Sequence, residues 1–245
     1  MGKQIAVIGA AALAAVALAG CGGGNHDVSV VPRESSVFAT GNRIGLEAPA
    51  KIIDTAEATF RAASSVRVRS IDPKQPGRVV ADVVMTRRGA TGWGLYNGRK
   101  VNFVLVGGRL YLRSRAYWSG LDPTIGRVIG DGWAAMPSDA SPLLTGYEHS
   151  IGQFADQMLA PIGSDPGPTI KGKRMVTVGG RPAVLVSLYD LDYQVAATGK
   201  PFPLRFASGG DGPDLEFSGY DRPVTITAPR GAIDLDKPLD VPAKG

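Results

Sequence analysis

The sequence has little of what most enzyme chemistry requires. Its 245 residues include one cysteine and two histidines, His26 and His149. Glu148, His149 and Ser150 are adjacent, but consecutive side chains do not converge on a substrate. No G-x-S-x-G nucleophile elbow occurs either. We therefore expect that the protein is not an enzyme.

Patterns for metals, phosphates and nucleic acids are also missing. The two D-x-D pairs, at 190–192 and 234–236, lack the spacing of a calcium loop and are expected to be solvated carboxylates. The glycines at 22–24 form a linker, not a phosphate-binding loop. Although the net charge is +5, the basic residues are scattered without a run. We expect no metal, no cofactor and no nucleic-acid partner.

Aromatic residues are scarce, at 7%, whereas glycine (33) and proline (18) are common. This balance is typical of many short strands with turns and not of a helical bundle. Hydrophobic residues make up 44% of the chain, which excludes an intrinsically disordered protein.

No hydrophobic run is long enough to span a membrane comfortably. The longest is Ile5–Leu18, which has 14 residues, against roughly 20 for a spanning helix. Lys3 precedes it and Leu18-Ala19-Gly20-Cys21 follows, the pattern of a bacterial lipobox. We predict a lipoprotein signal peptide over 1–20 and a diacylglyceryl anchor on Cys21. The alternative is an ordinary secretory signal followed by a chance cysteine.

A lipidated Cys21 would place the mature chain on the extracytoplasmic face of the cell membrane. It would also use the only thiol, so no disulfide is expected. Residues 21–48 are polar and without clear period, and we predict a flexible tether there, with at most a short strand at Val28–Val31. A single domain is predicted over 49–240. A division into 49–115 and 130–235 is the alternative.

Two helices are predicted in this domain. Apolar residues fall on one face of Pro49–Ala63, and Pro49 suits a helix start. A second helix is predicted at 151–159, before Pro161. Residues 117–129 have partial helical spacing that Pro123 and three glycines weaken, so a lid, a core helix or a loop all stay open.

Alternating apolar residues predict the strands, and Asn97-Gly98, Gly107-Gly108 and Gly179-Gly180 predict tight hairpin turns. A short extended piece is expected at 131–137. The predicted strands are 65–71, 78–88, 90–96, 101–106, 110–113, 173–178, 182–188, 203–206, 214–219 and a closing strand at Val224–Thr227. This order predicts an α+β fold with one large antiparallel sheet and helices on one face.

Several segments resemble a known family. They are GRLYLRSRAYWSGL (108–121), DGWAAMP (131–137) and LEFSGYDRPVTITAP (215–229), which follow the lipobox and the first helix. The chain is similar in these respects to actinobacterial envelope lipoproteins of the LppX and LprG type, which share the LolA-like fold. The resemblance implies a curved half-barrel sheet with helices packed on its concave face. It also implies a carrier for acyl lipids or glycolipids, with an envelope transporter as a possible partner.

In such a fold, apolar strand faces and the first helix would line a hydrophobic cavity. The candidate lining residues are Ile52, Phe60, Val83, Met85, Phe103, Leu105, Val184 and Val186. The alternative is that these residues form an ordinary filled core, in which case the protein would be an envelope scaffold or interaction protein without a lipid ligand.

One row of cations is a candidate headgroup site. Arg109, Tyr111, Arg113 and Arg115 alternate and would share one face of a strand, where they could bind anionic headgroups or glycan phosphates. A solvated sheet edge is the alternative explanation.

Overall fold

The computed structural model describes residues 41–75, 77–139, 146–158, 170–188, 191–209 and 212–238. The chain divides into two units, Met1–Arg33 and Glu34–Gly245, and all described residues belong to the second. The predicted signal peptide, Cys21 and the strand at 28–31 lie outside the described residues.

The second unit alternates groups of strands with short helices. Its helices are η1 (Ile44–Leu46, a 3-10 turn), α2 (Pro49–Ala62), α3 (Arg115–Leu121), α4 (Pro123–Ile129) and α5 (Ile151–Met158). Its strands are β1 (Ser65–Ile71), β2 (Val79–Thr86), β3 (Gly89–Tyr96), β4 (Arg99–Val106), β5 (Arg109–Arg113), β6 (Ala134–Pro137), β7 (Ile170–Val178), β8 (Arg181–Leu188), β9 (Leu191–Ala196), β10 (Pro203–Ser208), β11 (Asp214–Ser218) and β12 (Ile233–Asp234).

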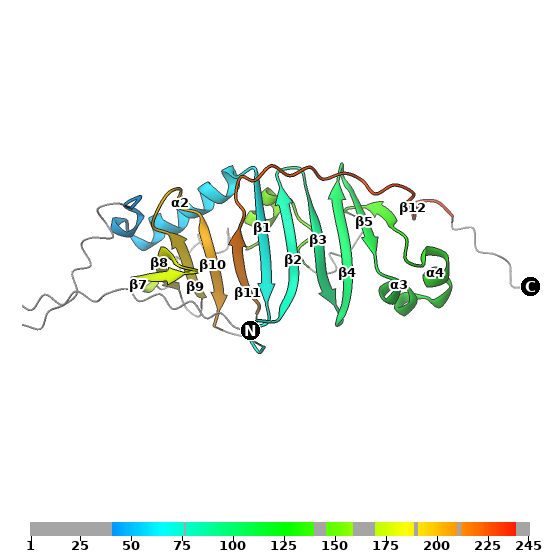
Figure 1. The fold of residues 1–245 in the computed structure, drawn as a ribbon, viewed down its shortest axis with the longest axis horizontal. Helices are drawn as coiled ribbons and strands as arrows, with labels where there is room; N and C mark the ends of the chain where they lie inside the picture. Colours follow the sequence, from blue (N-terminus) through cyan, green and yellow to red (C-terminus); the bar gives the residue numbers. More distant parts are fainter. Residues whose placement is uncertain are drawn as a thin grey trace, which may run out of the picture. The chain divides into compact units, whose positions relative to one another are not determined.

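The twelve described strands form one sheet in the order β12-β6-β5-β4-β3-β2-β1-β11-β10-β9-β8-β7 (Figure 1). Neighbours are antiparallel except β12 and β6, which run parallel. The pairing of β1 with β11 joins strands from the two ends of the domain, with Val68 opposite Phe217. Strands from 49–115 and from 130–235 therefore belong to one sheet.

Tight turns connect the hairpins where the sequence predicts them. Asn97 and Gly98 have φ angles of 48° and 74°, and Gly107 and Gly108 have 61° and 73°. Two successive left-handed residues match the right-handed twist of the flanking strands, and they favour asparagine and glycine. The predicted strands between 65 and 113 are confirmed, with ends that differ by a residue or two.

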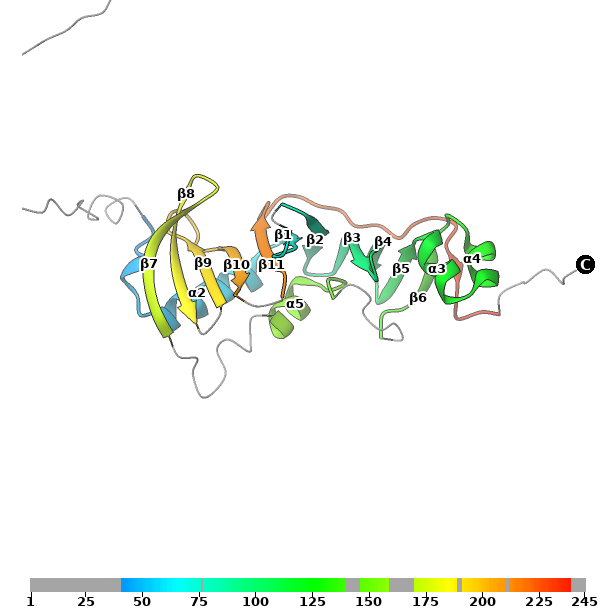
Figure 2. The ribbon, with the colours of Figure 1, turned by 90° about the horizontal axis from the view of Figure 1, so that it is seen from below.

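Helices α2 and α5 lie on the same face of the sheet, here called the inner face (Figure 2). Phe60 of α2 contacts Phe154 of α5 and Phe217 of β11, with ring centroids 5.9 Å and 5.7 Å away. Apolar side chains of both helices and of the inner face form one buried cluster. The predicted α+β fold, an open half-barrel sheet with helices on one face, is confirmed.

The predicted tether extends too far along the chain. At Asn42, the side-chain amide donates hydrogen bonds to the carbonyl oxygens of Ala196 and Gly199, 2.9 Å and 3.0 Å away. Ile44 is buried in the core. The boundary at residue 48 is therefore wrong, because a polar and Gly-containing stretch can still be held by the backbone of the β9–β10 turn.

The closing strand predicted at Val224–Thr227 is wrong. This stretch belongs to residues 219–232, here called the strap, which crosses the ends of β1–β5 from β11 to β12 (Figure 1). Its alternating sequence finds no strand edge with which to pair, and Pro223 lacks an N–H group to donate. Beyond it, Ile233–Asp234 pairs with β6 instead.

Residues 117–129 contain two short helices. Asp122 ends α3 and begins α4, where its carboxylate accepts hydrogen bonds from the N–H groups of Thr124 and Ile125. Pro123 occupies the first turn of α4, a position that tolerates proline. The segment is thus neither a loop nor one continuous helix. The short extended piece became β6, whereas β9 is a strand that the sequence pattern did not predict.

Candidate functional site

All eight residues predicted to line a cavity are buried on the inner side of the sheet or on α2. None is more than 7% exposed, and all belong to the same apolar cluster. They are Ile52 and Phe60 on α2, Val83 and Met85 on β2, Phe103 and Leu105 on β4, and Val184 and Val186 on β8. The structure therefore gathers them as expected, although burial alone is also what a filled core would show.

The inner face carries its smallest side chains on β3, in the middle of the sheet, and this part of the face is here called the low region. Here Ala90, Gly92 and Gly94 take the inward positions, opposite Met85, Val83 and Ala81 of β2. A methyl group on Gly92 would clash with the carbonyl oxygen of Asp82. Glycine is therefore required for the close approach of β2 and β3, and it leaves little side-chain volume above the sheet.

The described helices approach the sheet on either side of this low region. α2 packs against β7, β9 and β10, and α3 packs against β4. Tyr117 and Trp118 of α3 stack edge to face, 4.8 Å apart, beside Tyr96 at the end of β3. Small residues on β3 thus lie between two groups of helices.

Four side-chain polar atoms are buried with no hydrogen-bond partner among the described residues: Tyr193 Oη, His149 Nε2, Trp118 Nε1 and Arg205 Nε. The first three belong to residues that are at most 3% exposed, whereas Arg205 pairs with Asp214 through another nitrogen of its guanidinium. Burial raises the pKa of Tyr193 far above its usual range and lowers the pKa of His149, so both side chains are neutral at pH 7. Buried polar groups without partners are uncommon in fully packed protein cores, because each one lowers the free energy of unfolding.

The adjacent Glu148, His149 and Ser150 do not form a catalytic group. Ser150 begins α5, where its N–H group and hydroxyl donate hydrogen bonds to Gln153 Oε1, 3.0 Å and 2.9 Å away. This is the capping-box arrangement of a helix start. Glu148 and His149 are buried beside it, at 2% exposure each. The serine hydroxyl is thus engaged in capping the helix.

The four best-defined hollows on the described part are not lined by any of the eight predicted cavity residues. The first, about 700 Å³, lies over the outward side chains of β1, β10 and β11 and is lined by charged and apolar groups. Ion pairs cross it, including Arg205 with Asp214 at 2.6 Å and Arg69 with Glu216 at 3.3 Å. Its cations and carboxylates largely neutralise one another.

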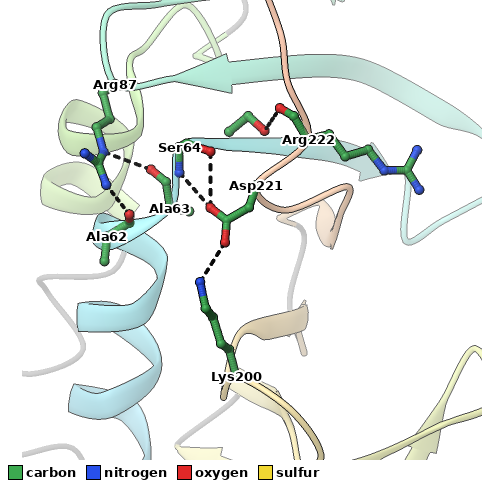
Figure 3. Close-up of polar contacts among 8 residues, drawn as sticks. Ala62, Ala63, Ser64, Arg87, Lys200, Asp221 and Arg222 are labelled. Atoms are coloured by element: carbon green, nitrogen blue, oxygen red, sulfur yellow. Dashed lines mark hydrogen bonds and ion pairs between the residues drawn. The ribbon is translucent and has the colours of Figure 1, made fainter.

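A polar network joins α2, β1 and the start of the strap (Figure 3). Asp221 accepts hydrogen bonds from Lys200 Nζ and from the Ser64 N–H group, both 2.9 Å away, which lower the pKa of its carboxyl group. Arg87 donates to the carbonyl oxygens of Ala62 and Ala63 at the end of α2. These contacts fix the helix end and the strap to each other.

The predicted cation row is only partly present. Arg109, Tyr111 and Arg113 share the outer face of β5, but Arg115 lies in α3. The guanidinium of Arg109 contacts Asp234 at 2.5 Å and Asp236 at 3.0 Å. The D-x-D pair at 234–236, expected to be solvated, therefore neutralises Arg109 and attaches the end of the strap to β5.

The comparison with solved structures bears on the fold. The crystal structure of LprF from Mycobacterium bovis matches with a TM-score of 0.50 at 15% identity, over 75% of this chain and 97% of LprF. The chain shares its fold with LprF. The crystal structure of the lipoprotein LppX from Mycobacterium tuberculosis matches with a TM-score of 0.46 at 14% identity, over 73% of this chain and 98% of LppX.

The likeness to LprF thus confirms, at the level of the fold, the resemblance expected from the sequence. No protein-family model matches the chain. No curated protein matches it either. Within the described ranges, no helix is long and apolar enough to cross a membrane, and no group of side chains could hold a metal ion.

Proposed function

We propose that the protein is a lipoprotein, anchored through Cys21 on the extracytoplasmic face of the cell membrane, that binds or shuttles an acyl lipid or glycolipid. The ligand would lie between the helices and the inner face of the sheet. No covalent chemistry is required, because the transfer of an acyl chain from water into an apolar interior is favourable by about 0.8 kcal/mol for each buried methylene. The shared fold with LprF and the lipobox support this proposal.

The buried polar atoms without partners carry the proposal. A finished core would satisfy the Tyr193 hydroxyl and the Trp118 indole N–H, whereas an ester or glycan oxygen of a bound lipid would accept hydrogen bonds from them. The low region over Ala90, Gly92 and Gly94 lies between the helices, and the acyl chains would lie over it once the helices separate. An envelope transporter that loads or unloads the protein is a further part of the proposal.

An envelope scaffold without a ligand is the second candidate. The eight predicted lining residues form one continuous cluster, and none of the four hollows described above opens onto them. In that case the interior would be a filled core and the function would depend on the surface.

Tyr193→Phe separates the two candidates, because it removes one hydroxyl and keeps the ring. We expect a chain that starts at Gly22 to take up a fluorescent fatty-acid probe, and the variant to bind it about fivefold or more weakly, as expected for one lost hydrogen bond. Tyr111→Phe, which removes a hydroxyl on the outer face, is the matched control.

The scaffold predicts the opposite pattern. Neither protein would take up the probe, and the free energy of unfolding would rise by about 1–3 kcal/mol in Tyr193→Phe, because a buried unpaired hydroxyl is removed. Denaturant unfolding of both proteins without probe measures this difference.

A further inference from the structure

The outer face of β3–β6 carries a row of aromatic and cationic side chains that the proposed lipid site does not use. Register places Trp93 opposite Asn102 and Asn102 opposite Arg113, and Trp133 comes directly before β6. The Lys100 ammonium lies 4.3 Å from the centre of the Trp93 ring, and the Arg113 guanidinium lies 5.1 Å from that of Trp133. Two cation–π pairs therefore occupy this face.

The neighbouring row is apolar. Val84, Thr91, Val104, Tyr111 and Ala135 follow one another across five strands on the same face. The described helices bury their apolar side chains on the inner face instead, and on the outer face the strap passes beside Val84 and Thr91. Trp93, Tyr111 and Trp133 are half-buried there, whereas Lys100 and Arg113 are exposed. Three large rings on a sheet face that no described helix covers indicate a binding surface.

The charges on this face select an anionic partner. Asp82 is paired with Arg67 at 2.5 Å, and Asp234 and Asp236 are paired with Arg109. Lys100 and Arg113, by contrast, have no carboxylate partner in the part of the chain that the structure describes. The unpaired charge beside the tryptophans is therefore positive.

We propose that this outer face, defined by Trp93, Lys100, Tyr111, Arg113 and Trp133, docks on an anionic lipid bilayer. Tryptophan and tyrosine rings favour the headgroup region of a membrane, with an apolar body and a polar tip. Lysine and arginine extend from apolar surroundings toward the phosphates. Bilayer docking goes beyond the proposed function, since it uses the opposite face of the sheet and needs no opening of the interior.

A tether makes weak docking sufficient. If Cys21 carries the predicted lipid, about 20 residues separate it from Asn42, so the covalent chain cannot let the domain move more than about 70 Å from the bilayer. Binding to the surface then becomes an intramolecular event with a high effective concentration.

The test is sedimentation of a chain that starts at Gly22, and so contains every described element, with vesicles of phosphatidylcholine alone or with 30% phosphatidylglycerol. We expect binding to the anionic vesicles that falls with added salt. Lys100→Glu with Arg113→Glu is expected to weaken it at least about 25-fold, at about fivefold for each lost cation. Lys51→Glu with Arg174→Glu, which changes exposed cations elsewhere by the same charge, is the matched control.

Brominated lipids provide a second readout. We expect them to quench tryptophan fluorescence in the wild type and much less in Trp93→Phe with Trp133→Phe, whose remaining Trp118 is buried. The proposal is overturned if the wild type fails to bind anionic vesicles, as it would if this face bound a protein or glycan. It is also overturned if binding is equal on both vesicle types, or if the control pair loses as much as the test pair. Probe uptake by the interior is measured separately, so failure of docking leaves the proposed lipid site distinguishable.

Discussion

The two halves of the sheet differ in where most of their large aromatic side chains lie. In the half formed by β1 and β7–β11, rings point inward, where Phe60 and Phe154 meet Phe217, and Tyr193 meets Phe206 at 6.1 Å. In the half formed by β2–β6, Tyr96 and Phe103 also point inward, but the other inward positions of β3 are alanine and glycine, and two of the three tryptophans lie on the outer face. We infer that the first half supplies most of the stability and the second is available to ligands and surfaces.

Removal of one inward ring gives the largest expected effect. Phe60→Ala should lower the free energy of unfolding by about 3–5 kcal/mol, because it leaves a cavity among Phe154, Phe217 and Tyr220. Trp93→Ala, on the outer face of the other half, should cost much less. Denaturant unfolding measures both, and equal costs would contradict the contrast between the halves.

A methyl group added to β3 at Gly92 tests the close approach of β2 and β3. Gly92→Ala should cost about 1–3 kcal/mol, because the new Cβ would clash with the backbone of Asp82 and Val83. Thermal unfolding is the measurement, and Gly152→Ala serves as a control because nothing surrounds that Cβ. A neutral effect at Gly92 would show that the two strands can separate freely.

Acidification should weaken the contact between α5 and the sheet. Burial lowers the pKa of His149 below its usual value of about 6.5, so the unfolded chain binds a proton first as the pH falls. The contribution of His149 to the free energy of unfolding should therefore be complete above pH 6.5. Below pH 6.5 the free energy of unfolding should decline by about 1.4 kcal/mol for each pH unit, down to the pKa of the folded state.

His149→Gln should abolish this slope below pH 6.5, which denaturant unfolding at several pH values would reveal. Lys200 and Ser64 lower the pKa of the Asp221 carboxyl group. This group therefore adds to the loss of stability only at lower pH, as the pH falls below about 3.8. An unchanged slope in His149→Gln would mean that other groups cause the acid sensitivity.

The smallest expected effect is a gain. Gly152→Ala should stabilise the protein by about 0.5–1 kcal/mol, because alanine favours the helical backbone and Gly152 is exposed in α5 with open space around it. Thermal unfolding should show a higher midpoint. If α5 contributes little to the native state, the substitution will leave the midpoint unchanged.

Much of the fold could be predicted from local patterns. Alternation between Ser65 and Arg113 and the glycine turns placed the meander, because side-chain period and turn geometry are local properties. The pairing of β1 with β11 could not be found this way, since it joins residues about 150 positions apart. β9 was missed because Asp192 interrupts its apolar residues, and Ser187 compensates with a 2.7 Å hydrogen bond to that carboxylate.

The candidate site was predictable only in outline. Alternation correctly placed Val83 and Phe103 inside, but it cannot tell a cavity from a core. Tyr193 was missed with its strand, and Trp118 was read as part of a weak helix, so the buried polar atoms had no sequence signal. The partner of Arg109 comes from the other end of the chain, which is why the predicted row of free cations was too long.

The most direct measurement is lipid mass spectrometry of a chain that starts at Gly22, purified without detergent from a host with a similar envelope. We predict a stoichiometric acyl lipid, whose headgroup would identify the ligand class, and its loss in Val83→Trp, which places a large ring on the inner face opposite Gly92. A folded protein that is empty and takes up no added lipid would contradict lipid binding and favour the scaffold.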